Sequence, residues 1–342
     1  MSKAIKKVRL HTFLCTVLLC TSVYASPRDR GFGFYMDQDL LVPISNEDRD
    51  YTMGMAFEFF WSKEKSLPLD FLVTKAGKWL GIDEKENNFT YSLMLGTVAY
   101  TPDDLADSQP IFSDRPYSSL IYLSNKRVHA DGKTALAAEV MVGLIGTDIA
   151  RYVQTQFHEW YRSLNNSDEP VEPMGWDHQI SNGGEPTFRI RLTNAHLHTD
   201  LSKAGVYDVS SSYGLSLGYQ TNASVSIAGR LGNVQSPFWS IPFDPVNRGN
   251  FIPSRAKDEW YFWSAFRIHL VAYDALLQGQ FRDSDVEYAA DQIEPLVYDG
   301  GVGFTWTFDK SQITLSANAK SPDLKFVSRH QVWGGINYMI YF

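Results

Sequence analysis

The sequence predicts an all-β fold, a twelve-stranded antiparallel transmembrane β-barrel of the bacterial outer membrane with short helical segments in its loops. Three observations predict it. Apolar and polar residues alternate along many segments, the chain ends in an aromatic residue, and no apolar run after residue 25 approaches the roughly 18 residues of a membrane-spanning helix.

The first 25 residues are expected to be a secretory signal peptide and not part of the fold. Basic residues precede an apolar run from Phe13 to Val23, which is followed by Tyr24 and Ala25, and this order is typical of a cleaved export signal. Both cysteines of the chain lie inside it, so the exported protein is expected to use neither disulfides nor a thiolate nucleophile. The barrel domain is then expected over residues 26–342.

The strands are marked by alternation with a period of two. From Tyr51 to Trp61 the odd positions are large and apolar, whereas the even positions include Thr52, Gly54 and Glu58. Across the chain the polar positions are mostly small, as in a crowded barrel lumen, and the apolar positions are rich in aromatic residues, as in a lipid-facing band. Twelve such segments lie near 31–39, 51–62, 89–101, 117–125, 134–146, 186–198, 207–219, 223–232, 259–272, 297–309, 312–320 and 331–342. Closure of these strands into a barrel removes the sheet edges that lipid does not tolerate.

The last segment carries a signal of its own. Tyr338, Ile340 and Phe342 alternate up to the terminal carboxylate, which resembles the assembly signal of bacterial outer-membrane barrels. The long gaps between strands are polar and are interpreted as extracellular loops, since periplasmic turns are short. These gaps cover roughly 63–88, 102–116, 147–185, 233–258 and 273–296.

Charge and motif searches narrow the function. Lys and Arg number 31 against 39 Asp and Glu, a formal net charge of −8, which argues against nucleic acid as a partner. Gly214, Ser216 and Gly218 match the serine-hydrolase motif G-x-S-x-G, but they lie in mid-strand and not at the strand-to-helix turn that this motif needs. We interpret them as small residues that face the lumen.

Polar residues that are unusual for a plain pore gather near the expected strand ends. They are Gln38 and Asp39, the run Asp48 to Thr52, the run Tyr100 to Asp104, the run Asp114 to Tyr117, the pair Gln154 and His158, the run Gly175 to Gln179, and the run Asn182 to Pro186. Because Gln154 and His158 are four residues apart, they share a face on a short helix, and the amide is able to orient the imidazole or its water.

These motifs resemble those of the outer-membrane lipid A deacylase family, which removes the 3′-linked acyloxyacyl chain of lipopolysaccharide. The motifs D-R-x-Y-T-x-G, Y-T-P, D-R-P-Y and Q-x-x-x-H…G-W-D-x-Q…E-P stand in family order within residues 31–342. The resemblance implies a twelve-stranded barrel with its site near the outer rim, between barrel wall and loops. It also implies ester hydrolysis by a histidine-activated water with a divalent cation, typically calcium.

Carried onto this sequence, the resemblance implies catalytic roles for several residues. His158 is the expected base, Thr52 and Gln154 are expected in the site, and Asp39 is the expected metal ligand, since calcium prefers carboxylate oxygens. Gln38 stands where the family usually has Asn, at a position of metal or oxyanion contact. Strand parity places Thr52 on the lumen face and Asp39 on the same face as Tyr35.

Some of these residues have a second interpretation. Arg115 either contacts a lipid A phosphate or neutralises a lumen carboxylate such as Glu58 or Glu139. Asp39 is alternatively a lumen salt-bridge partner, and Trp176 is either an interfacial girdle residue or packs within a loop.

Three classes of function remain open at this point: an ester hydrolase on lipid A, another outer-membrane acyl hydrolase such as a phospholipase, and a barrel with a binding or structural role. The first is the preferred prediction. This prediction implies lipid A of lipopolysaccharide as the substrate and a divalent cation such as Ca²⁺ as the cofactor. The protein is expected to be a monomer surrounded by outer-membrane lipid.

Overall fold

The computed structural model describes residues 30–42, 49–62, 70–79, 89–165, 171–200, 203, 205–244, 246 and 258–342. The expected signal peptide lies outside the described residues. The elements in chain order are β1 (Arg30–Gln38), η1 (Asp39–Leu41), β2 (Asp50–Trp61), α2 (Asp70–Trp79), β3 (Phe89–Thr101), β4 (Ser118–Asp131), β5 (Thr134–Ile145), α3 (Asp148–Asn165), η2 (Gly175–His178), β6 (Glu185–Leu197), β7 (Tyr207–Gly218), β8 (Gln220–Asn233), β9 (Asp258–Asp274), α5 (Ala275–Gln278), β10 (Leu296–Phe308), β11 (Ser311–Lys320) and β12 (Gln331–Tyr341).

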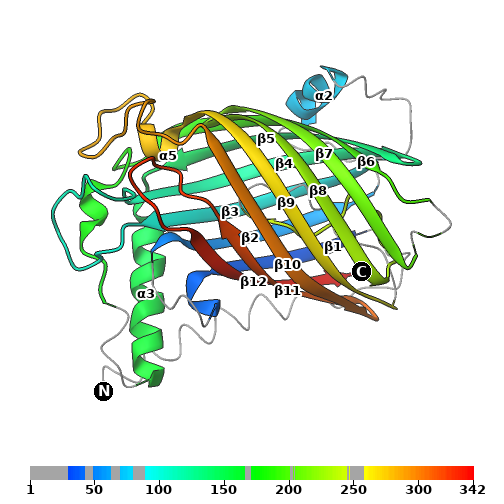
Figure 1. The fold of residues 1–342 in the computed structure, drawn as a ribbon. Helices are drawn as coiled ribbons and strands as arrows, with labels where there is room; N and C mark the ends of the chain where they lie inside the picture. Colours follow the sequence, from blue (N-terminus) through cyan, green and yellow to red (C-terminus); the bar gives the residue numbers. More distant parts are fainter. Residues whose placement is uncertain are drawn as a thin grey trace.

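The strands form one closed antiparallel barrel in which each strand pairs with its neighbours in sequence and β1 pairs with β12 (Figure 1). The prediction of a twelve-stranded antiparallel barrel is therefore confirmed. Most bounds agree closely with the predicted segments, and β4 differs most, since it continues to Asp131 and does not end near 125. The polar residues there remain in the strand because Arg127 stacks on the ring of Phe89, with its Cζ 3.7 Å from the ring centroid. Among the described helices, none is long and apolar enough to cross a membrane.

The outside of the barrel is apolar and its lumen is polar, which confirms the predicted inversion of the faces. Exposed apolar side chains of the strands include Phe57, Leu95, Phe188, Leu215, Ile227, Phe262, Ile268, Val302, Trp306 and Leu315. Charged side chains at the alternate strand positions point into the lumen. In β9, Arg267 donates to Asp299 at 2.6 Å and His269 lies 3.1 Å from the same carboxylate. Buried charges in the lumen are thus paired, as their desolvation requires.

The long connections lie at both ends of the barrel. Because neighbouring strands run in opposite directions, the connections after β2, β4, β6, β8 and β10 share the end at which β1 begins and β12 ends. Two-residue turns at 132–133 and 309–310 lie at this end, whereas five of the six connections at the other end have ten residues or more, so we assign this end to the periplasm. The strand ends that flank 63–88 and 233–258 lie at this end, which contradicts the prediction that these connections are extracellular, while those that flank 102–116, 147–185 and 273–296 lie at the extracellular end.

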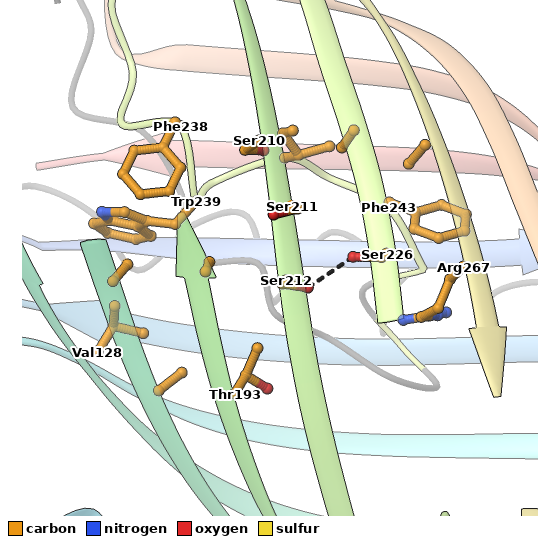
Figure 2. Close-up of a pocket in the computed structure, with 16 residues that line it drawn as sticks. Val128, Thr193, Ser210, Ser211, Ser212, Ser226, Phe238, Trp239, Phe243 and Arg267 are labelled. Carbon is orange, nitrogen blue, oxygen red and sulfur yellow. Dashed lines mark hydrogen bonds between the residues drawn. The ribbon is translucent and has the colours of Figure 1, made fainter. Parts of the chain in front are cut away.

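Residues 234–244 and 246, here called the plug segment, fold from the periplasmic end back into the lumen. Phe243 packs on Trp263 with ring centroids 6.2 Å apart, and Asp244 accepts a hydrogen bond of 2.8 Å from Arg267. Tyr122 of β4 donates to the backbone carbonyl of Val246. Beside the segment remains a cavity of about 70 Å³ lined by residues such as Ser212, Ser226, Trp239 and Arg267 (Figure 2). The plug segment and the paired charges therefore fill much of the barrel interior.

Candidate functional site

α3 leaves the extracellular rim of the barrel directly after β5 (Figure 1). Gly146 precedes it with φ at +73°, and a Cβ there would lie 2.4 Å from the carbonyl oxygen of Ile180 and 2.1 Å from that of Ser181. Glycine thus permits a turn that no other residue adopts without strain. Asp148 in the first turn and Arg162 in the last complement the helix dipole.

The inner face of α3 packs on the outer side of the barrel wall. Ala150 of α3 belongs to a buried cluster with Met53 of β2 and Ala99 of β3. These two wall residues point away from the lumen, since they alternate in phase with the exposed Phe57 and Leu95. The helix therefore covers the ends of β2 and β3 from outside and forms a site between helix and wall.

Gln154 lies on this inner face, one turn before His158. Its Oε1 accepts a hydrogen bond of 2.8 Å from Nε1 of Trp176. Trp176 is fully buried in η2, and its ring packs on Tyr117 with centroids 4.9 Å apart. Trp176 therefore packs within a loop and is not an interfacial girdle residue. The hydrogen bond from its ring to the Gln154 amide connects α3 to that loop.

His158 is completely buried, with 0% of its surface exposed. Its Nδ1 lies 2.9 Å from the backbone carbonyl oxygen of Val171. Because a carbonyl oxygen only accepts, Nδ1 carries the hydrogen, and the lone pair of the neutral ring is on Nε2. A ring fixed in this tautomer is prepared to accept a proton at Nε2.

A β-bulge at Thr52 changes the predicted orientation of its neighbours. The pairing with β3 shifts between Tyr51 and Met53, so Thr52 is the extra residue. Tyr51 points into the lumen and donates to Asp37 at 2.9 Å, whereas Oγ1 of Thr52 lies 2.6 Å from Oγ1 of Thr101. The predictions that Tyr51 faces lipid and Thr52 faces the lumen are wrong, because the bulge interrupts the strict alternation on which they rest.

Asp39 follows β1 directly and begins η1, so strand parity with Tyr35 does not extend to it. Gln38, which pairs in register with Met53, donates from Nε2 to Oδ1 of Asp39 at 3.0 Å. The backbone N–H of Arg49 donates to Oδ2 at 3.0 Å. The carboxylate is thus buried and held in position by two donors at the outer rim.

The groups around Asp39 offer oxygen ligands, which are the type of ligand that a hard cation prefers. A buried carboxylate, the amide carbonyl of Gln38 and the hydroxyl of Thr52 lie on adjoining positions of two paired strands. Among the described residues, no group of three or more His, Cys, Asp or Glu side chains is placed to hold a metal ion. Since Ca²⁺ takes about six to eight oxygen ligands, a calcium ion here would also need backbone, water or substrate oxygens.

Arg115 lies on the lumen side of the rim in a network of ion pairs. Its guanidinium stacks on Tyr100, with Cζ 3.8 Å from the ring centroid, and donates to Asp323. Asp323 also pairs with Lys320 at 2.6 Å. Burial alone raises the pKa of Asp323, but the positive charges of Lys320 and Arg115 outweigh it and hold this pKa below its usual range. Arg115 therefore neutralises a buried carboxylate, as one of its two interpretations predicted. The carboxylate is that of Asp323 and not that of Glu58 or Glu139.

The two suggested carboxylates have other partners. Tyr35 donates to Glu58, and Arg189 lies 3.3 Å from Glu139. Arg329 extends the rim network by pairing with Asp50 at 2.8 Å and with Asp114. Burial lowers the pKa of Arg329, but these two carboxylates raise it above its ordinary value.

The structure places five of the predicted site residues at the extracellular rim, in two groups. Gln38, Asp39 and Thr52 adjoin one another on and beside the paired strands β1 and β2. Gln154 and His158 lie on α3, where they contact Trp176 and Val171. Arg115 belongs to neither group, because it faces the lumen network. Thr101 lies in the predicted run Tyr100 to Asp104, but no role was assigned to it from sequence, and Arg329 lies outside every motif.

Comparison with known proteins agrees with this architecture. The model of the family described as outer membrane protein LpxR matches residues 12–342. The solved structure of LpxR from Salmonella typhimurium superposes with a TM-score of 0.71 at 13% identity, covering 91% of this chain and 100% of that one. The translocator domain of autotransporter NalP from Neisseria meningitidis gives a TM-score of 0.41 at 9% identity, covering 99% of this chain and 96% of that one. No curated protein sequence matches significantly.

Proposed function

Because the chain belongs to the family of outer membrane protein LpxR and is a barrel of the bacterial outer membrane, we propose that it is a lipid A 3′-O-deacylase. In this proposal the protein hydrolyses the ester that attaches the 3′-linked acyloxyacyl chain to lipid A. The motifs that the chain shares with lipid A deacylases support the choice of substrate, and the arrangement at the outer rim supports the chemistry.

The observation that carries the proposal is the setting of His158. Its ring is completely buried, and its Nδ1 donates to the carbonyl of Val171, so the neutral form of the ring has its lone pair on Nε2. A neutral imidazole held in one tautomer is the most frequent general base of hydrolytic enzymes. Its burial excludes bulk water, which strengthens electrostatic contacts with the reacting ester.

The reaction requires one water and one ester. Nε2 of His158 takes a proton from the water while its oxygen attacks the ester carbonyl carbon. The tetrahedral intermediate then collapses, the bond to the sugar oxygen breaks, and the imidazolium returns its proton to that oxygen. The products are the free acyloxyacyl acid, with its secondary ester intact, and the 3′-hydroxyl of the sugar, and His158 is neutral again.

Two groups on the wall would support this step. The hydroxyl pair of Thr52 and Thr101 supplies a buried donor for the oxyanion that forms on the carbonyl oxygen. Asp39, with Gln38 beside it, would hold a divalent cation that polarises the carbonyl when bound. Gln154 acts as a positioning residue, because it fixes α3 through Trp176.

A lipid substrate fits the outer surface of α3. Its side opposite His158 is exposed and carries four large apolar residues, Ile149, Tyr152, Trp160 and Leu164. Their spacing of three, eight and four residues places them on one helix face. This face is suited to contact acyl chains next to the site.

The test uses the purified, folded protein in detergent with calcium and two substrates, hexa-acylated lipid A and phosphatidylethanolamine. Mass spectrometry is expected to detect loss of the 3′-linked acyloxyacyl chain from lipid A and no fatty acid from the phospholipid. Hydrolysis of the phospholipid alone would assign the protein to the phospholipases, and no hydrolysis of either would favour a binding or structural role.

A further inference from the structure

α2 lies outside the barrel wall, in the connection between β2 and β3 (Figure 1). Val73 is buried against Ala138 and Val140 of β5. These two residues point outward, since they alternate in phase with the exposed Val142 and Leu144. α2 therefore covers part of the surface that otherwise faces lipid.

The depth of α2 follows from its contact with β4. Thr74 accepts a hydrogen bond of 3.2 Å from Arg127, which pairs in register with Tyr91. Tyr91 stacks on Trp61, the last residue of β2, with centroids 6.0 Å apart. Trp61 and Tyr91 lie near the periplasmic ends of their strands, whereas Val140, which Val73 contacts, lies near the middle of β5. α2 thus lies along the periplasmic half of the outer wall.

The side of α2 that faces away from the wall combines aromatic and basic residues. Phe71 is 61% exposed and Trp79 is 71% exposed, and Lys75 and Lys78 are exposed between them. The spacing of four, seven and eight residues from Phe71 places all of them on one face. Amphipathic helices of this composition lie in membrane interfaces, with aromatic rings among the acyl chains and lysines extended to the headgroups.

We propose that α2 is a binding surface for anionic phospholipid headgroups of the periplasmic leaflet. The two lysines supply the complementary charge on a chain whose formal net charge is −8, and the two rings supply the apolar contact. The surface lies near the end of the barrel opposite to the proposed catalytic site, so the inference is independent of the proposed function.

The test measures hydrogen exchange of the α2 backbone amides in the full-length folded protein. The protein is reconstituted in nanodiscs of phosphatidylcholine alone or with one part in three of phosphatidylglycerol. A lysine near an anionic surface contributes about 1 kcal/mol, which corresponds to a factor of about five. We expect α2 to exchange at least fivefold more slowly with phosphatidylglycerol, and we expect Lys75→Gln/Lys78→Gln to lose this difference.

The matched control is Lys310→Gln, which removes an exposed cation from a periplasmic turn away from α2 and should keep the difference. Equal α2 exchange of the wild-type protein in both compositions would overturn the proposal, as would an equal loss in the control variant. If the double variant does not fold, as judged by heat modifiability, the wild-type comparison alone decides.

Discussion

At the scale of single residues, His158 is the side chain on which the proposed chemistry depends most. His158→Asn should lower turnover by roughly 10²–10⁴-fold, the loss expected when a general base is removed. The barrel should remain folded, because α3 lies outside the strand ladder. The measurement is the initial rate of acyl release, with the gel shift between heated and unheated samples as the folding control.

Gln154→Ala is the matched comparison on the same helix face. It removes the acceptor for Trp176 but leaves the imidazole in place. We therefore expect a smaller loss of turnover than in His158→Asn. A larger loss in Gln154→Ala would contradict the assignment of His158 as the base.

Asp39 links the proposed site to a cation. Chelation should abolish hydrolysis and added calcium should restore it, and Asp39→Asn should reproduce chelation because it removes the carboxylate charge but keeps its shape. Direct binding of calcium, measured by calorimetry, should disappear in the same variant. Full activity in excess chelator would remove the cation from the account and leave Asp39 as a structural carboxylate held by Gln38 and Arg49.

At the scale of elements, the extracellular rim depends on buried ion pairs. Because the pKa of Asp323 is lowered in the folded protein, its stabilising contribution is complete above the ordinary aspartate value of about 3.9 and is lost as the pH falls below it. The unfolding midpoint of the protein in detergent should fall between about pH 4 and pH 2. The unfolding midpoint of Asp323→Asn should be lower than that of the wild-type protein at pH 4 and should change less between pH 4 and pH 2.

Asp200→Asn provides the control for an exposed pair. Asp200 lies 3.8 Å from Lys133 at the other end, and its side chain is largely exposed. Such pairs contribute about 0–1 kcal/mol, so this variant should follow the wild-type pH profile. Identical profiles for Asp323→Asn and wild type would show that the rim network does not carry the acid sensitivity.

The plug segment determines whether ions pass through the barrel lumen. Because it packs inside the lumen, the protein should show no stable ion conductance in a planar bilayer. Phe243→Ala combined with Asp244→Ala removes both a buried ring and the carboxylate that pairs with Arg267. This variant should show intermittent channel openings, whereas a large steady conductance of the wild-type protein would contradict the plugged lumen.

At the scale of the whole molecule, the barrel was largely predictable from sequence, because alternation reports side-chain environment along every strand. In β9, Arg267 and His269 alternate with apolar neighbours in the sequence, and the structure pairs both with Asp299 in the lumen. The bulge at Thr52 could not be predicted, because one extra residue changes the side of its neighbours without changing the pattern of residue types.

The site was predictable only as a set of motifs. The sequence placed Gln154 and His158 on one helix, but it could not place that helix on the outside of the wall, since this depends on contacts of Ala150 with β2 and β3. The partner of Arg115 was likewise hidden, because Asp323 is 208 residues away in the chain. Contacts between loops that are far apart in the chain leave no pattern in the local sequence from which they could be predicted.

The central claim is that the protein removes the 3′-linked chain from lipid A in the outer membrane. The most direct measurement is mass spectrometry of lipid A from cells that express the wild-type protein, His158→Asn, or neither, with outer-membrane fractionation and heat modifiability showing equal amounts of folded barrel. We expect lipid A to be lighter by the 3′-linked acyloxyacyl chain only in cells that express the wild-type protein. Unchanged lipid A beside an abundant folded wild-type barrel, or equal loss with His158→Asn, would contradict it.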